Sequence, residues 1–378
     1  MKEYITVIGG GLAGAEAAYQ IAKRGINVKL YEMKPRVFSP AHSNVNLAEV
    51  VCSNSFKSNA ITNACGLLKE ELRKLDSLLI ACADETSVPA GQALAVDRER
   101  FSELVTRKLE SFSGGKIEII REEYASDLAS EDGIVIIATG PLTSDKMTVE
   151  INKIIGDDKL FFYDAVAPII EKESIDFNIA FFGDRYGKGD GSYINLPMNK
   201  EEYQDFYQAL ISAEVVELHE FEKKEIFEGC MPVEIMAKRG IDTLRYGPLK
   251  PVGFTDPRTN SMPYAIVQLR QDNKEGTMYN MVGFQTNLKF TEQKKVFSMI
   301  PGLKNASFLK YGVMHRNTYI NSPKLLDNTY NYIRNDNIFF AGQISGVEGY
   351  VESIASRFCC CYKCKQKIFK RRKSGVPK

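Results

Sequence analysis

The sequence has no long apolar segment and no recognisable targeting sequence. No hydrophobic run approaches the roughly 20 residues that a helix needs to cross a membrane. The chain opens with MKEYITVIGGG, so a strand is predicted almost from Met1, and the charged, apolar and small-residue series of a secretory signal is lacking. We therefore expect a cytoplasmic protein without a membrane partner, whose eight cysteines are reduced thiols and not a disulfide framework.

Acidic residues are missing from the last part of the chain. Residues 357–378 hold nine Lys or Arg and no Asp or Glu, which leaves 40 basic against 48 acidic residues in 1–356. Because residues 1–356 are net acidic, any polyanion that they bind must meet local basic patches. No internal repeat or low-complexity linker interrupts the 378 residues, which suffice for two domains or for one large domain with an insertion.

The most informative segment is ITVIGGGLAGAEAAYQIAKRGINVKLYEMKP, near the start of the chain. A strand leads into a G-x-G-x-x-G turn and an alanine-rich helix, and the next strand ends in Glu32, which can accept hydrogen bonds from ribose hydroxyls. A bare glycine-rich turn would lack this order of strand, turn, helix, strand and acid. We predict a dinucleotide site with the pyrophosphate at the helix N-terminus, in a turn formed by Gly9, Gly10, Gly11, Leu12, Ala13 and Gly14.

Two later strands decide between NAD and FAD. GIVIIATGP, which contains Gly140, and NIFFAGQISGVEGYVESIAS, which contains Gly342, are each an apolar strand that runs into a glycine turn. Each alone would also suit an ordinary strand of a parallel sheet. Together they resemble the late elements of glutathione-reductase-type flavoproteins, which close over FAD. We expect Gly346, Val347 and Glu348, at the start of a last helix, to present backbone N–H groups to the flavin or pyrophosphate.

The middle of the chain differs in composition and pattern, with aromatic residues, turn glycines, alternating apolar and polar residues, and a polar helix-like run from Glu201 to Phe227. The predicted fold is therefore α/β: a Rossmann FAD-binding domain of the glutathione-reductase type, interrupted by an inserted α+β domain. We place the FAD-binding domain at 1–145 and 305–356, the insertion at 146–304, and an aberrant basic tail at 357–378.

Many segments, in one order over 1–356, resemble the folate- and FAD-dependent tRNA (uracil-5-)-methyltransferase family. They include YEMKP, VCSNSFKSN, PAGQALAVDR, FEGCMPVEIMAKRG, RYGPLKPVG, VQLRQDN, YGVMHRNTYINSP and FFAGQISGVEGYVES. The resemblance implies C5 methylation of a uridine in the T loop of tRNA. The carbon would come from 5,10-methylenetetrahydrofolate, and the reducing equivalents from FADH2, itself reduced by NADPH or NADH.

Two cysteines lie in segments that match the functional pair of that family. Uracil C5 is a weak nucleophile until a thiolate adds to C6, and a second group must then remove the C5 proton. The resemblance implies that Cys230, in EGCMP, adds to C6 and that Cys52, in VCSNS, is the second thiol near the flavin, as base or covalent partner. The alternative is that the two cysteines exchange these steps. Hydroxyls, amides and Lys57 near Cys52 can stabilise a thiolate there. Cys65 and Cys82 are predicted core residues.

Other candidates rest on single residues. The resemblance implies that His315 stacks on the pteridine ring, and a hydrogen-bonded structural histidine is the alternative. Five basic residues are candidates for contacts to tRNA phosphate or to the glutamate of folate: Lys238, Arg239, Lys250, Arg270 and Arg316. The alternative is that they are solvated surface residues, as scattered charges usually are. A uracil in a folded T loop must leave its stack to react, which predicts a pocket between the two domains.

The tail departs from the family pattern, which calls for Gly and then an apolar, alanine-containing helix after VESIAS. It reads RFCCCYKCKQKIFKRRKSGVPK, whose cysteines lack the spacing of structural zinc and any nearby His, so we expect no metal. A disordered basic arm and a nucleic-acid-binding segment are two alternative interpretations of these residues. A shift of one base in suitable codons gives Gly-Phe-Val-Ala-Ala-Ile-Asn-Ala-Ser, which has the Gly and the apolar helix of the family pattern. We therefore favour the hypothesis that 357–378 are a frameshift product. The positive charges of this segment would weaken closure of the last helix over FAD.

Two further functions stay open at this point. The first keeps the chemistry and changes the substrate to a 23S rRNA uridine. The second is a non-catalytic flavin- or RNA-binding remnant, because a shared fold does not by itself establish turnover.

Overall fold

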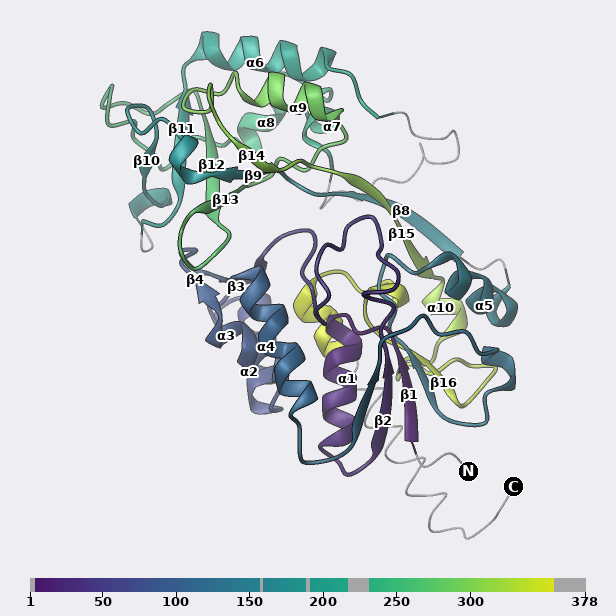
Figure 1. Cartoon of the computed structure of the whole chain (residues 1–378). Coiled ribbons are helices and arrows are strands. Elements are labelled where there is room, and N and C mark those ends of the chain that lie inside the picture. Colours follow the sequence, from purple (N-terminus) through teal and green to yellow (C-terminus); the bar gives the residue numbers. More distant parts are fainter. Residues whose placement is uncertain (1–3, 157–158, 188–190, 217–230, 357–378) are drawn as a thin grey trace.

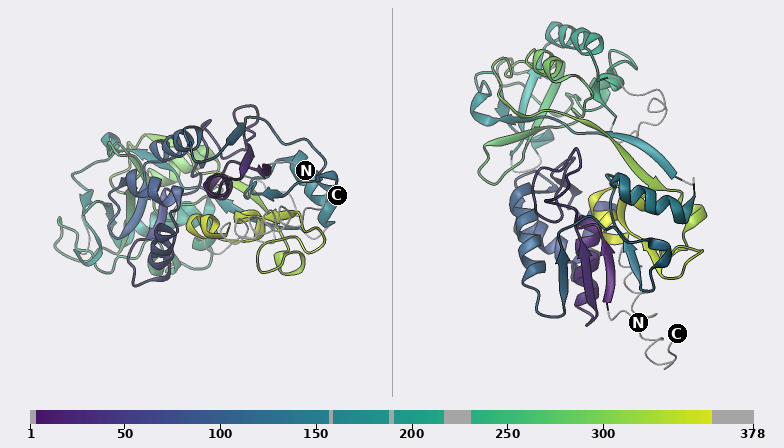
Figure 2. Two further views of the ribbon diagram at one scale, coloured as in Figure 1. Left: turned by 90° about the horizontal axis from the view of Figure 1, so that it is seen from below. Right: turned by 45° about the vertical axis from the view of Figure 1, so that its right-hand side comes forward.

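The structure is a computed structural model, which describes residues 4–156, 159–187, 191–216 and 231–356 (Figure 1). Two lobes lie one above the other. The parallel-sheet lobe holds the described parts of 4–156 and 321–356, and the antiparallel-sheet lobe holds those of 166–313. Two long antiparallel strands join the lobes, β8 (Lys159–Ala165) and β15 (Met314–Ile320). The right-hand view in Figure 2 shows the same two lobes and the same link.

The parallel-sheet lobe is built on five parallel strands in the order β16-β7-β1-β2-β6. Most of their side chains are apolar and buried, as parallel strands covered on both faces require. Helix α1 (Leu12–Ala22) contributes Ala15, Ala17, Ala18 and Ile21 to the core on one face. The strands are β1 (Tyr4–Ile8), β2 (Asn27–Tyr31), β6 (Ile117–Ile120), β7 (Val135–Ile137) and β16 (Ile338–Phe340).

Smaller elements complete this lobe. Side chains of Asn63, Ser77 and Asp97 cap the N-termini of α2, α3 and α4, which stabilises the helix starts. These helices are α2 (Ala64–Lys74), α3 (Leu78–Glu85) and α4 (Arg98–Glu110), beside a small antiparallel sheet of β3 (Ser55–Ser58), β5 (Ala93–Val96) and β4 (Ser87–Val88). The other face of the parallel sheet packs against α5 (Asp145–Ile155) and α10 (Ser322–Leu325).

The antiparallel-sheet lobe has six strands in the order β10-β11-β12-β13-β9-β14. They are β10 (Phe181–Phe182), β11 (Ile194–Met198), β12 (Ala265–Gln271), β13 (Met278–Met281), β9 (Ile169–Glu171) and β14 (Phe308–Lys310). Their inward side chains share one core with the helices above the sheet in Figure 1. Those helices are α6 (Lys200–Ser212), α7 (Val233–Ala237), α8 (Thr243–Tyr246) and α9 (Phe290–Phe297). Short 3-10 turns lie at Leu128–Ser130, Lys172–Ser174, Arg185–Gly187 and Gly342–Ser345.

The predicted α/β fold, a Rossmann parallel sheet with a mixed insertion, is confirmed. The helix predicted from Glu201 to Phe227 was wrong in extent, because α6 ends at Ser212 where Ala213 turns to extended backbone; 217–227 lie outside the described residues. Domain boundaries at 1–145, 146–304 and 305–356 remain a prediction, and so does the reading of 357–378, which is not described. No helix in the described part of the chain is long and apolar enough to cross a membrane.

Candidate functional site

A cleft opens at the carboxyl ends of the parallel strands. β1 pairs with β2 on one side and β7 on the other, and ligands of such sheets bind where the order reverses. The residues that follow these strands line a cleft that is continuous with solvent. They include Gly9, Gly10, Gly11, Leu12, Ala13, Glu32, Gly140 and Gly342 among the predicted site residues.

The glycine turn after β1 is crowded on one side and open on the other. Gly9 has φ +101°, and a Cβ there would lie 2.5 Å from the carbonyl oxygen of Ala138. A Cβ on Gly14 would collide with the Gly9 carbonyl, so helix α1 packs too closely for a side chain. Gly11 differs, because a Cβ there would meet nothing within 4 Å and would enter the cleft. Gly11 is also the N-cap of α1 without a side-chain cap, which suits a phosphate group at this position.

Glu32 is buried directly after β2, with 6% of its surface exposed. One carboxylate oxygen accepts a hydrogen bond from the Gly10 amide at 3.1 Å, and the other accepts one from the Lys34 amide at 2.9 Å. An ionised carboxylate has about four acceptor positions, so capacity remains for ribose hydroxyls. Glu32 therefore fixes the glycine turn in place and still faces the cleft.

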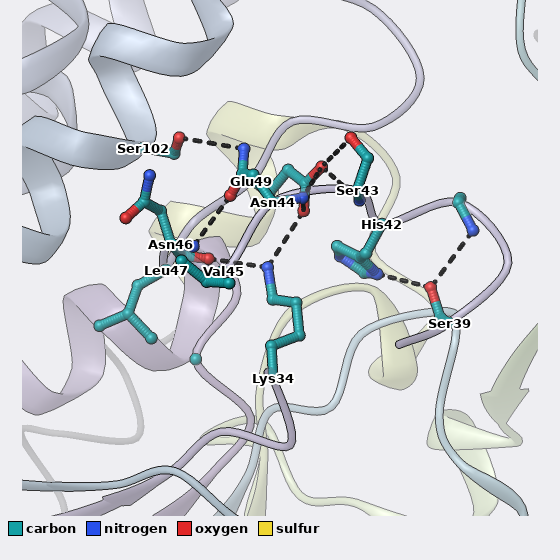
Figure 3. A network of polar contacts seen from close by, with 12 residues as sticks. Lys34, Ser39, His42, Ser43, Asn44, Val45, Asn46, Leu47, Glu49 and Ser102 are labelled. Atoms are coloured by element: carbon teal, nitrogen blue, oxygen red, sulfur yellow. Dashed lines mark hydrogen bonds and ion pairs between the residues drawn. The ribbon is translucent and has the colours of Figure 1, made fainter. Parts of the chain in front are cut away.

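The cleft is also lined by Lys34, His42 and Glu49, which were not among the predicted site residues. Figure 3 shows these side chains among the polar contacts of this segment. The Lys34 ammonium lies 3.1 Å from Glu49 and donates to the Asn46 carbonyl at 2.7 Å. Although burial raises the pKa of Glu49, the Ser43 amide and the Lys34 charge lower it overall. A basic residue two positions after the strand-terminal acid was the available signal. This network orders residues 34–49 beside the cleft.

The later glycine turns lie on the far wall of the cleft. Gly140 has φ +69°, and a Cβ there would meet nothing within 4 Å. Gly342 also lines the cleft, at the start of its 3-10 turn. Gly346, Val347 and Glu348 are not among the lining residues, and the helix that we expected to begin at Val347 begins at 350. The reason is that Gly346, with φ +80°, ends the 3-10 turn in a left-handed conformation.

The backbone of Cys52 is tied to the wall of the cleft by Tyr350. The Tyr350 hydroxyl accepts hydrogen bonds from the amides of Cys52 and Ser53, at 3.0 and 3.1 Å. Tyr350 also lines the cleft, and burial raises the pKa of its hydroxyl, which therefore stays neutral. The segment 50–54, here called the Cys52 loop, is thus anchored at the edge of the cleft through one aromatic side chain.

Two arginines attach the same loop to the antiparallel-sheet lobe. Arg98 donates to the Val50 carbonyl at 2.8 Å, and its Nε lies 3.0 Å from both carboxylate oxygens of Asp272. Arg270 donates to the Asn54 side chain at 2.9 Å and to the Ser53 hydroxyl at 2.7 Å. Arg270 lies near the end of β12 and Asp272 just beyond it, so the two lobes meet at the Cys52 loop.

These contacts change several expectations. Arg270 is 8% exposed and contacts the Cys52 loop, so it was wrongly grouped with the scattered surface cations. Lys57, which we expected to help to stabilise a thiolate at Cys52, forms an ion pair with Glu352 at 3.0 Å. Cys65 is only half-buried in the first turn of α2, so it was wrongly placed in the core, whereas Cys82 is fully buried and burial raises the pKa of its thiol to about 11.

Some predicted residues cannot be placed. Cys230 lies outside the described residues, and nothing is described of the side chains of His315 and Arg316 on β15. Lys238, Arg239 and Lys250 are exposed on the antiparallel-sheet lobe. Within the described ranges, no group of three or more His, Cys, Asp and Glu side chains is arranged to hold a metal ion.

Comparison with known proteins gives three kinds of match. The profile of the family described as "Glucose inhibited division protein A" (GIDA) matches residues 4–369. Methylenetetrahydrofolate--tRNA-(uracil-5-)-methyltransferase TrmFO of Acetivibrio thermocellus is 60% identical over 356 residues, which are 94% of this chain and 81% of the relative. The protein of that name from Fusobacterium nucleatum subsp. nucleatum is 61% identical, with the same coverage.

Among solved structures, GidA from Aquifex aeolicus in its form II crystal superposes with a TM-score of 0.71. The two sequences are 15% identical, and the match covers 97% of this chain, which spans 64% of the length of that structure. This likeness supports the fold alone. The profile and the curated relatives, however, cover most of the chain, so the chain belongs to the GIDA family and, within it, to the methylenetetrahydrofolate--tRNA-(uracil-5-)-methyltransferases.

Proposed function

We propose that this protein methylates C5 of a uridine in the T loop of tRNA, with 5,10-methylenetetrahydrofolate as the carbon donor and FAD as the bound cofactor. The observation that carries the proposal is the anchoring of Cys52 at a dinucleotide-type cleft by Tyr350, in a chain about 60% identical to the tRNA methyltransferases named above. The close relatives carry tRNA in their names, so we place tRNA before the 23S rRNA alternative.

The residues of the cleft fit FAD. Gly11 and Gly140 leave open space where any other residue would place a Cβ, and the N-terminus of α1 has no side-chain cap. We assign the pyrophosphate to the turn at 9–14, the ribose to Glu32, and the flavin end to the side of Gly140, Gly342 and Tyr350. FAD, once reduced by NADPH or NADH, supplies the reducing equivalents that bring the one-carbon unit to the methyl level.

The two cysteines divide the remaining chemistry. We propose that Cys230 forms a bond from sulfur to uracil C6, which moves electron density to C5 and lets C5 bond to the methylene carbon of the donor. The two bonds from this carbon to the folate nitrogens break, so that tetrahydrofolate leaves. Loss of the C5 proton to a base and cleavage of the sulfur–C6 bond then restore the aromatic ring. Cys52 is our candidate for the second thiol, as base or covalent partner, because its backbone is held next to the cleft. The part of Cys230 rests on the family resemblance.

A chain that binds flavin or RNA without turnover remains the competing function, since the segment 357–378 differs from the family pattern. We also propose that the protein acts in the cytoplasm, where tRNA is modified. Purified protein should be incubated with FAD, NADPH, labelled methylenetetrahydrofolate and an unmodified tRNA transcript. Label in 5-methyluridine supports the proposal, and flavin reduction by NADPH without any labelled nucleoside would favour the non-catalytic alternative.

A further inference from the structure

Three aromatic rings lie in a row on the antiparallel-sheet lobe. Phe290 begins α9, and its ring stacks on Tyr311 with centroids 5.2 Å apart and an angle of 22° between the planes. Tyr311 in turn stacks on Phe308 at 5.7 Å and 10°. The row ends at Phe290, which is 57% exposed, so a flat aromatic face is offered to solvent.

Lysines flank the exposed end of this row. A shallow depression, here called the Phe290 surface, is lined by Phe290, Thr291, Lys294, Lys295 and Tyr311. Lys294 follows Phe290 by one helical turn and therefore lies on the same side of α9. Lys295 is 3.6 Å from Glu292, but its side chain is 71% exposed, so this pair is weak and leaves the ammonium available. The surface thus combines a stacking ring with two cations.

The two segments that form the Phe290 surface are fixed to each other by Gln293. Its side chain is fully buried, donates to the carbonyls of Leu288 and Gly312 at 2.7 and 2.8 Å, and accepts from the Gly312 amide at 2.8 Å. The two hydrogen bonds to Gly312 hold the loop after β14 against α9, and the bond to Leu288 fixes Gln293 to the segment that leads into this helix. The arrangement of ring and lysines is therefore set before any ligand binds.

The position of the Phe290 surface connects it to the proposed chemistry. The segment 285–289, just before Phe290, holds both described ends of the stretch that contains Cys230. On one side the Val216 amide donates to Asn287 at 2.9 Å, and on the other the Val233 amide donates to Gln285 at 2.7 Å. The loop from Tyr311 to Val313 also leads directly into β15, which runs to the parallel-sheet lobe (Figure 1).

We propose that the Phe290 surface docks the RNA substrate by stacking an unpaired base on Phe290 and by placing phosphates at Lys294 and Lys295. This inference rests on the proposed function, because it names where the tRNA of that reaction is held. Single-stranded and loop nucleotides are recognised by aromatic stacking together with cations along the backbone, and the Phe290 surface offers both. Since residues 1–356 are net acidic, such local patches are where a polyanion can bind.

The test uses the full chain, loaded with FAD, and an unmodified tRNA transcript labelled for fluorescence anisotropy. Phe290→Ala should weaken tRNA binding about 10-fold, whereas Phe290→Tyr should retain it, because stacking needs the ring and tolerates a hydroxyl. Lys294→Gln should reduce the slope of log Kd against log salt concentration by about 1. Matched controls are Tyr246→Ala, at a residue 83% exposed on α8, and Lys200→Gln on α6. Flavin reduction by NADPH should be equal in all variants.

Three outcomes would overturn the proposal. Unchanged tRNA affinity in both Phe290→Ala and Lys294→Gln, with methylation by the wild type, would refute the surface and leave the proposed function standing. An altered sedimentation coefficient with unchanged tRNA affinity would assign the surface to a second copy of this chain. A wild-type protein that neither binds nor methylates tRNA would overturn the proposed function and this inference with it.

Discussion

The ion pair between Arg98 and Asp272 should control both stability and the reactivity of Cys52. Their side chains are 12% and 3% exposed, and although burial lowers the pKa of Arg98, the Asp272 charge raises it overall. Removing one partner of a buried pair costs about 3–5 kcal/mol, because the other charge is left without compensation. We therefore expect Asp272→Ala to lower the free energy of unfolding by about 3–5 kcal/mol.

A double variant separates the charge from the packing. Arg98→Met with Asp272→Leu removes both charges, so its stability should lie much closer to that of the wild type. The double variant loses the hydrogen bond from Arg98 to the Val50 carbonyl, and Asp272→Ala loses the carboxylate that holds Arg98 in place. The rate at which iodoacetamide alkylates Cys52 should therefore change in each. Urea unfolding and peptide mass spectrometry measure the two quantities. A loss below about 1 kcal/mol in Asp272→Ala, well under the value for a buried pair, together with unchanged alkylation, would show that this ion pair controls neither the stability nor the Cys52 loop.

Three further predictions follow from the cleft and its neighbours. Gly11→Val should abolish FAD binding with little loss of stability, whereas Gly14→Ala should destabilise the fold itself, and a yellow Gly11→Val protein would contradict the phosphate assignment. Tyr350→Phe should lower the free energy of unfolding by about 1–3 kcal/mol, because the amides of Cys52 and Ser53 lose their acceptor. Denaturant unfolding measures this change. The Cys82 thiol, with a pKa of about 11, should resist Ellman's reagent at pH 8 in the folded protein and react after unfolding, and equal rates in both states would exclude its burial.

The parts of this molecule that the sequence predicted are those encoded locally. The strand, glycine turn, helix and strand that end in Glu32 lie within about 30 residues, so periodicity and turn chemistry sufficed. The α/β class followed from the same kind of pattern in the later apolar strands. Element ends were less accurate, since α6 stops at Ser212 and the last helix begins at 350. A cap or a left-handed glycine sets such ends, and a polar run alone does not reveal them.

The surroundings of Cys52 could not be predicted in the same way. Arg270 and Tyr350 contact this loop from more than 200 positions along the chain, and no local pattern distinguishes Arg270 from an exposed arginine. The role of Lys34 was missed for a related reason, because its partner Glu49 is brought near by the path of an irregular segment. Such contacts depend on tertiary packing, which the linear order of residues does not show.

Transfer of the one-carbon unit to tRNA is the reaction that separates a methyltransferase from a protein that only binds flavin or RNA. Wild-type protein and Cys230→Ala are loaded with FAD and given NADPH, labelled methylenetetrahydrofolate and an unmodified tRNA transcript, and the digested nucleosides are measured by mass spectrometry. The proposed function requires labelled 5-methyluridine from the wild type and none from Cys230→Ala, with flavin reduction equal in both. An FAD-loaded wild-type protein that is reduced by NADPH but forms no 5-methyluridine would contradict it.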